Sequence, residues 1–89
     1  MKHLSIKIFG RVQGVFFRAE TKKKAEELGL AGFTKNERDG TLLIEAEGEE
    51  RLLRDFLYWC KKGPVGAHIT YMEVYEGPPG GFKGFEVRG

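Results

Sequence analysis

The chain has 89 residues, of which 31% are charged, and its formal net charge at pH 7 is +2. This length suits one small domain with its site in a shallow surface loop, and it excludes a large internal catalytic cavity. Charges of both signs are interspersed, which argues against a dedicated nucleic-acid-binding protein. The single cysteine excludes an internal disulfide and favours a reducing compartment. The sequence has no apolar run of membrane-spanning length and no signal-peptide pattern, so we expect a cytoplasmic protein without membrane association.

The first half of the chain predicts a strand, a helix and a hairpin. Apolar and polar residues alternate over residues 3–9, which indicates a half-buried strand. Residues 17–29 have the apolar spacing of a helix that ends at a glycine. Two strands are predicted at 31–37 and 41–47, because Asp-Gly between such runs is typical of a hairpin.

The second half predicts a helix and two further strands. Five apolar residues mark an amphipathic helix from about residue 49 to 62: Leu52, Leu53, Phe56, Leu57 and Cys60. A strand follows at 68–76, and residues 84–88 fit a short fifth strand against the sheet edge. The order strand, helix, strand, strand, helix, strand is the split βαβ pattern of the ferredoxin-like α+β fold. We therefore predict a single domain over 1–89, with one antiparallel sheet that carries two helices on one face.

The run "GRVQGVFFR", residues 10–18, lies between the first strand and the first helix. A helix start offers unpaired N–H groups, a glycine turn can aim N–H groups at an anion, and arginine matches phosphate oxygens. Gly10, Gly14 and Arg18 thus provide the parts of a phosphate site, while an ordinary strand-to-helix turn fits the same local pattern. Neither G-x-x-x-x-G-K-[ST] nor G-x-G-x-x-G is present, so nucleotide binding is not favoured.

This run closely resembles the first motif of the acylphosphatase family, G-x-V-Q-G-V-x-F-R. Every fixed position matches, through Gly10, Val12, Gln13, Gly14, Val15, Phe17 and Arg18. Residues 32–48 resemble the second motif, an aromatic strand that leads to an asparagine and a hairpin glycine. The matching residues there are Gly32, Phe33, Lys35, Asn36, Gly40 and Gly48. Thr34 and Leu42 depart from the usual residues, and the resemblance covers essentially the whole chain.

The resemblance implies that the protein hydrolyses acyl phosphates to a carboxylate and inorganic phosphate. It implies that Arg18 binds the substrate phosphate and that Asn36 orients the attacking water. Backbone amides of a phosphate-binding loop would complete the site. We assign six residues to that loop: Gly10, Gln13, Gly14, Val15, Phe16 and Phe17. Strand alternation places Glu37 on the face opposite Asn36, away from the substrate.

Little catalytic machinery is expected beyond these residues. The two histidines, His3 and His68, lie in predicted strands without metal-ligand spacing. An acyl phosphate needs no general acid, because its carboxylate leaving group has a pKa of about 4. Phosphoryl transfer then depends on positioning and charge stabilisation, so we expect no cofactor and no metal. A surface site of this kind would leave the acyl group largely in solvent, which predicts broad acyl tolerance.

Two other functions fit parts of the sequence. RNA recognition motifs share the topology, and "KGFEV" at 83–87 resembles the start of their [K/R]-G-[F/Y] motif. That motif fails at Glu86, and Phe85 and Val87 are interpreted as core residues. The second alternative is a non-catalytic phosphate-binding or interaction domain, because the family pattern also occurs within larger carbamoyl-transfer maturation proteins. A chain of one domain favours a stand-alone hydrolase, which we expect to be a monomer that binds a small acyl phosphate and no nucleic acid.

Overall fold

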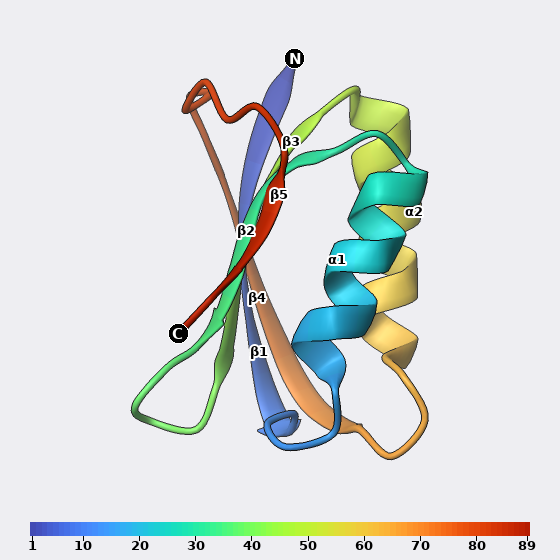
Figure 1. Cartoon of the computed structure of the whole chain (residues 1–89), viewed down its shortest axis with the longest axis vertical. Coiled ribbons are helices and arrows are strands. Elements are labelled where there is room, and N and C mark those ends of the chain that lie inside the picture. Colours follow the sequence, from blue (N-terminus) through green and yellow to red (C-terminus); the bar gives the residue numbers. More distant parts are fainter.

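Seven elements follow one another along the chain in the computed structural model, which describes all 89 residues. Their bounds are β1 Lys2–Arg11, α1 Phe17–Glu27, β2 Ala31–Asn36, β3 Leu42–Gly48, α2 Glu50–Lys62, β4 His68–Gly77 and β5 Phe85–Arg88. Both helices cover the same face of the sheet (Figure 1). Every element predicted from the sequence is confirmed, and β1 extends beyond the predicted strand by a residue or two at each end.

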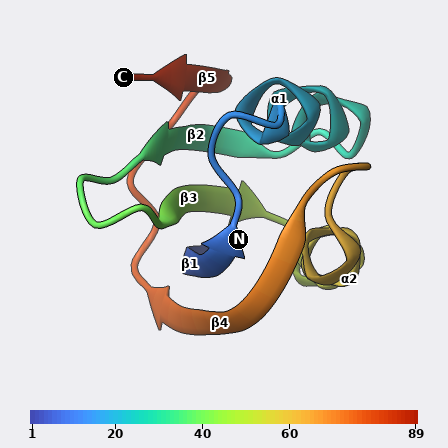
Figure 2. The same cartoon turned by 90° about the horizontal axis from the view of Figure 1, so that it is seen from below.

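The strands form one sheet in the order β4-β1-β3-β2-β5. Viewed from one end, β5 and β4 occupy the two edges and β1 and β3 lie inside (Figure 2). The first four strands pair in antiparallel fashion, as expected. The fifth strand pairs with β2 in parallel, so the complete sheet is mixed rather than wholly antiparallel.

The core lies between the sheet and the helices. β1 contributes alternate buried residues on its helix-facing side, and the helices contribute the residues at three- and four-residue spacing. The fully buried helix residues are Phe17, Thr21, Ala25, Leu53, Phe56 and Cys60. Burial raises the pKa of the Cys60 thiol, which makes it a packed side chain rather than a nucleophile. Neither helix combines the length and the apolar character needed to cross a membrane.

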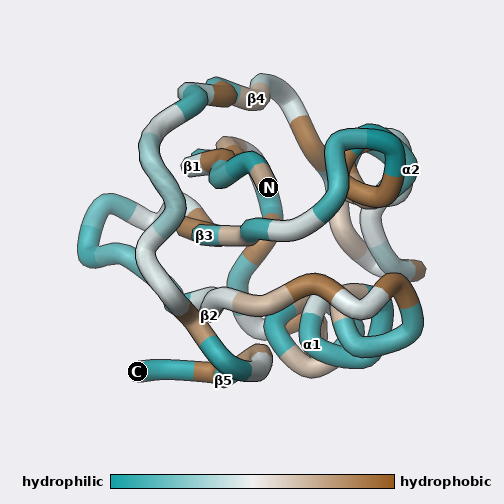
Figure 3. Tube along the Cα trace, turned by 90° about the horizontal axis from the view of Figure 1, so that it is seen from above, coloured by the Kyte–Doolittle hydropathy of each residue, from teal (hydrophilic) through white to brown (hydrophobic).

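Strand direction brings three chain segments to one end of the sheet. β1 and β2 both pair antiparallel with β3, and β5 pairs parallel with β2. β1, β2 and β5 therefore run in the same direction, and their C-terminal ends lie at the same end of the molecule (Figure 1). The loop from β1 to α1 and the hairpin from β2 to β3 lie at this end as well (Figure 1), and the hairpin is hydrophilic (Figure 3).

Candidate active site

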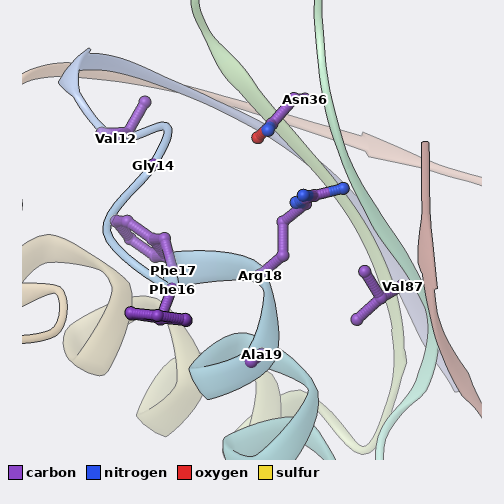
Figure 4. A pocket seen from close by; sticks show the side chains of 8 residues that line it. All are labelled: Val12, Gly14, Phe16, Phe17, Arg18, Ala19, Asn36 and Val87. Atoms are coloured by element: carbon purple, nitrogen blue, oxygen red, sulfur yellow. The ribbon is translucent and has the colours of Figure 1, made fainter.

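A surface cavity of about 280 Å³ opens at this end of the sheet. Its lining residues are Val12, Gly14, Phe16, Phe17, Arg18, Ala19, Asn36 and Val87 (Figure 4). Arg18 comes from the first turn of α1 and Asn36 from the last position of β2. The structure thus brings together the two residues that the resemblance marks as functional, although one lies on a helix and the other on a strand.

The loop that enters α1 leaves its backbone N–H groups unpaired. No amide from Val12 to Ala19 donates a hydrogen bond to another group of the protein. Gly14 has a φ of 75° and Phe16 a φ of 58°, so the loop turns sharply through the left-handed region before the helix begins. Unpaired amides in such a turn, followed by a helix N-terminus, form a binding site for an anion.

Arg18 carries a positive charge that no acidic side chain neutralises. It forms no ion pair with an Asp or Glu side chain, and no acidic side chain lines the cavity. One guanidinium nitrogen, Nη1, donates to the backbone oxygens of Arg88 at 3.1 Å and of Gly89, the last residue, at 2.9 Å. Parallel pairing of β5 with β2 brings those oxygens to the site, since Arg88 lies opposite Lys35. They hold the side chain and leave its other donors available to a ligand.

The Asn36 side chain has an unsatisfied acceptor. Its amide oxygen is buried and accepts no hydrogen bond from the protein. Burying an amide oxygen without a partner costs about 1–3 kcal/mol, so a hydrogen-bond donor brought by a ligand or a bound water would relieve that cost. Glu37 does not line the cavity and instead lies 3.7 Å from Lys35 in an ion pair, consistent with the expected strand alternation.

Gln13 ties the loop to the neighbouring hairpin. Its side-chain nitrogen donates to the carbonyl oxygens of Glu37 at 2.9 Å and Thr41 at 3.0 Å. Within the hairpin, the Asp39 carboxylate accepts from the Thr41 hydroxyl and amide and pairs with Lys7. These contacts lower the pKa of Asp39 to about 2, so the carboxylate is ionised and holds the turn closed. The hairpin that carries Asn36 is therefore fixed from both sides.

Gly14, Phe16 and Phe17 of the predicted phosphate-binding loop line the cavity, whereas Gly10, Gln13 and Val15 do not. Gly10 lies within β1, at a bulge where an added side chain would overlap the His68 carbonyl oxygen, and it does not line the cavity. Val15 is half-buried against the core. The Phe17 ring is buried and packs edge-on against Trp59, with ring centroids 5.9 Å apart. Val15 and Phe17 anchor the loop to the core, while the N–H groups of residues 12–19 remain available.

Ala19 and Val87 line the cavity but were not identified from the sequence. Phe85 is buried as expected, whereas Val87 is 42% exposed and is not a core residue. Both point to the same face of β5, but only Phe85 is covered by the helix layer, where it contacts Phe56. Val87 lies beyond that cover, beside Arg18. No sequence signal marks this position, because it depends on how β5 pairs.

Comparisons with known proteins agree with this geometry. The sequence model of the acylphosphatase family matches residues 4–87. An acylphosphatase of Rubrobacter xylanophilus is 43% identical over 88 residues, which cover 98% of this chain and 80% of that protein. The crystal structure of acylphosphatase from Bacillus subtilis superposes with a TM-score of 0.97 at 36% identity and covers 99% of both chains. A full-length HypF structure, in a phosphate- and nucleotide-bound form, matches with a TM-score of 0.93 at 34% identity over 12% of its length. The chain therefore belongs to the acylphosphatase family, whose activity is the hydrolysis of acyl phosphates.

Proposed function

We propose that the cavity holds the phosphate group of an acyl phosphate between Arg18 and the N–H groups of residues 12–19. The observation that carries this proposal is the run of unpaired amides that adjoins an arginine in a cavity without acidic side chains. Fixed N–H donors and a guanidinium need little rearrangement to meet an anion, so they can stabilise the charged oxygens of the transition state.

We assign to Asn36 the orientation of the attacking water. The amide has both a donor and an acceptor, and its oxygen has no partner in the protein. Water attacks phosphorus, the bond from phosphorus to the bridging oxygen breaks, and the bonding pair leaves with the carboxylate. The water proton passes to the phosphate product or to solvent. Because the leaving carboxylic acid has a pKa of about 4, the carboxylate leaves without a proton from the protein.

Gln13 acts as a positioning residue in this scheme. It does not line the cavity, but it links the phosphate loop to the hairpin that carries Asn36. Water and phosphorus must be held in line for the displacement, and small displacements of positioning groups cost large factors in rate.

Benzoyl phosphate hydrolysis in the presence of a chelator tests these roles, with the wild type compared with Asn36→Ala. Wild-type turnover is expected to be unaffected by the chelator, and Asn36→Ala is expected to lower kcat by about 10²–10³-fold. Inorganic phosphate should still inhibit the variant competitively, because Arg18 and the amides remain. Glu37→Gln is the matched control, since that neighbour points away from the cavity, and its KM should stay close to that of the wild type.

A different result would separate catalysis from binding. If folded wild type bound inorganic phosphate but did not hydrolyse benzoyl phosphate, the site would be a non-catalytic phosphate-binding domain. All proposed site residues come from one chain, so we also expect specific activity to be independent of protein concentration, as for a monomer.

A further inference from the structure

Phe16 has a conformation and an exposure that the packing of the fold does not explain. Its φ of 58° and ψ of 21° lie in the left-handed region, which is unfavourable for a bulky residue. Its side chain is 83% exposed, so burial in the core does not compensate for this conformation. Backbone strain of this kind at the edge of a site points to a role for the side chain in function.

A second cavity, of about 450 Å³, adjoins Phe16 on the side of the α2–β4 loop. Its lining residues are Val15, Phe16, Glu20, Trp59, Gly63, Pro64 and Val65. Most are apolar, Val65 is fully exposed, and Glu20 is the only charged residue among them. Phe16 lines both this apolar cavity and the cavity that contains Arg18 and Asn36, so the two adjoin the same ring.

The geometry of the reaction relates the two cavities. This step rests on the proposed function: if Asn36 orients the water, the leaving oxygen departs from the opposite side of phosphorus. Phe16 lies across the first cavity from Asn36 (Figure 4). The acyl carbon is joined to phosphorus through one bridging oxygen, so the first carbons of the acyl group would lie beside the Phe16 ring. A larger acyl group would continue from there into the second cavity.

We propose that Phe16, Trp59, Pro64 and Val65 form an acyl-group subsite that favours aromatic and long aliphatic acyl groups. An aromatic acyl group can stack on the Phe16 ring and cover apolar surface that is otherwise exposed to water. Glu20 at the edge disfavours acyl groups that carry their own negative charge. The protein thus contacts the acyl group and discriminates between acyl groups. The sequence alone leads us to expect an acyl group in solvent and broad acyl tolerance.

Selectivity between benzoyl phosphate and acetyl phosphate tests this subsite. The ratio of their kcat/KM values should favour benzoyl phosphate in the wild type and fall about tenfold in Phe16→Ala. Phe16→Tyr should retain the wild-type ratio, because it keeps the ring. Tyr58→Ala removes another exposed aromatic side chain, which lies outside both cavities, and should leave the ratio unchanged.

Val65→Ser tests the same subsite without changing the strained loop between β1 and α1, because Val65 lies in the connection from α2 to β4. The benzoyl-to-acetyl ratio should fall about threefold in this variant. An equal loss of both activities in Phe16→Ala, with no change in Val65→Ser, would overturn the subsite and leave acylphosphatase activity intact. Failure of folded wild type to hydrolyse either substrate would instead overturn the proposed function and the subsite with it.

Discussion

At the scale of single residues, the roles of two loop side chains become visible only in the folded structure. Gln13 matches the family motif, and its role becomes visible only through its two hydrogen bonds to the hairpin carbonyls. Phe16 occupies a variable position of the same motif, yet it is the one non-glycine residue with a positive φ. The sequence therefore predicts which residues belong to the loop, while the contact that each one makes depends on the folded backbone.

Replacing Gln13 with alanine removes both links between the loop and the hairpin. Each hydrogen bond contributes about 1 kcal/mol, and 1.4 kcal/mol corresponds to a tenfold change in rate. We expect kcat for benzoyl phosphate to fall about tenfold, while the inhibition constant of inorganic phosphate changes less than kcat. Gln13→Glu should be at least as impaired, because an ionised carboxylate cannot donate to two carbonyl oxygens. A kcat within twofold of the wild type in both variants would remove the positioning role.

Replacing Phe16 with glycine should stabilise the protein. The left-handed backbone of a bulky residue costs about 1–3 kcal/mol, and glycine relieves it at an entropic cost of about 0.5–1 kcal/mol. Urea unfolding should show that the free energy of unfolding of Phe16→Gly is about 1 kcal/mol higher than that of the wild type. Tyr58→Gly, at an exposed position inside α2, is the control and should lose about 1 kcal/mol. If the free energy of unfolding fell equally in Phe16→Gly and Tyr58→Gly, the Phe16 backbone would not be strained.

At the scale of elements, β5 is anchored through a buried cluster on the open face of the sheet. The Glu47 carboxylate accepts hydrogen bonds from the amides of Gly80 at 2.6 Å and Phe82 at 2.8 Å, in the segment that leads to β5. The His3 ring lies between two carboxylates: its Nδ1 is 2.8 Å from Glu47 Oε2, and its Nε2 is 2.5 Å from Glu45 Oε1. The ring also stacks on that of Phe82. The sequence predicts a polar strand face here, but it cannot show that the 78–84 segment covers that face and buries Glu47 to 2% exposure.

This cluster makes stability depend on pH in a defined window. Burial alone would lower the pKa of His3, but its hydrogen bonds with Glu45 and Glu47 prevail and raise it above 6.5. Burial alone would raise the pKa of Glu47, but the Gly80 amide, His3 and the Phe82 amide prevail and lower it below 4.5. The contribution of His3 to the free energy of unfolding is therefore complete below pH 6.5, and it is lost as pH rises through the raised pKa. The contribution of Glu47 to the free energy of unfolding is complete above pH 4.5, and it is lost as pH falls through the lowered pKa.

Glu47→Gln should accordingly destabilise the protein most between pH 4.5 and 6.5. The amide side chain can no longer accept from both backbone N–H groups, and we expect a loss of about 1–3 kcal/mol in that window. Urea unfolding at about pH 3, 5.5 and 9 should show a smaller difference at both extremes. Glu76→Gln, an exposed carboxylate on β4, should show little difference at any pH. A Glu47→Gln difference of the same size at all three pH values would contradict this account.

The inner face of α1 contains a polar group that packing does not satisfy. The Thr21 hydroxyl is buried and has no hydrogen-bond partner. Thr21→Val removes the hydroxyl with little change of shape, and we expect the free energy of unfolding to rise by about 1 kcal/mol. Thr34→Val is the matched control, because that buried hydroxyl donates to the Leu43 carbonyl at 3.0 Å. Thr34→Val should lower stability, and a similar response of the two variants would show that the Thr21 hydroxyl finds a partner.

At the scale of the whole molecule, the fold could be predicted almost completely and the site only in part. Hydrophobic periodicity and turn residues indicate every helix and strand, because each buries one face against the others. The parallel pairing of β5 leaves no periodic signal, and it determines where Val87 and the backbone oxygens that hold Arg18 lie. The proximity of Asn36 to Arg18 likewise follows from strand direction across the sheet, and only the family resemblance indicated it beforehand.

The most direct test of the central claim is a titration of the isotopically labelled protein with inorganic phosphate, followed by amide NMR chemical shifts. The amides of residues 12–19 should shift together and saturate at the concentration at which phosphate inhibits benzoyl phosphate hydrolysis. Arg18→Ala should weaken this response, while Lys23→Ala, which removes an exposed charge on α1, should leave it unchanged. Shifts centred on the lysines of α1, or no saturable shift in the loop, would contradict the assignment of this loop as the phosphate site.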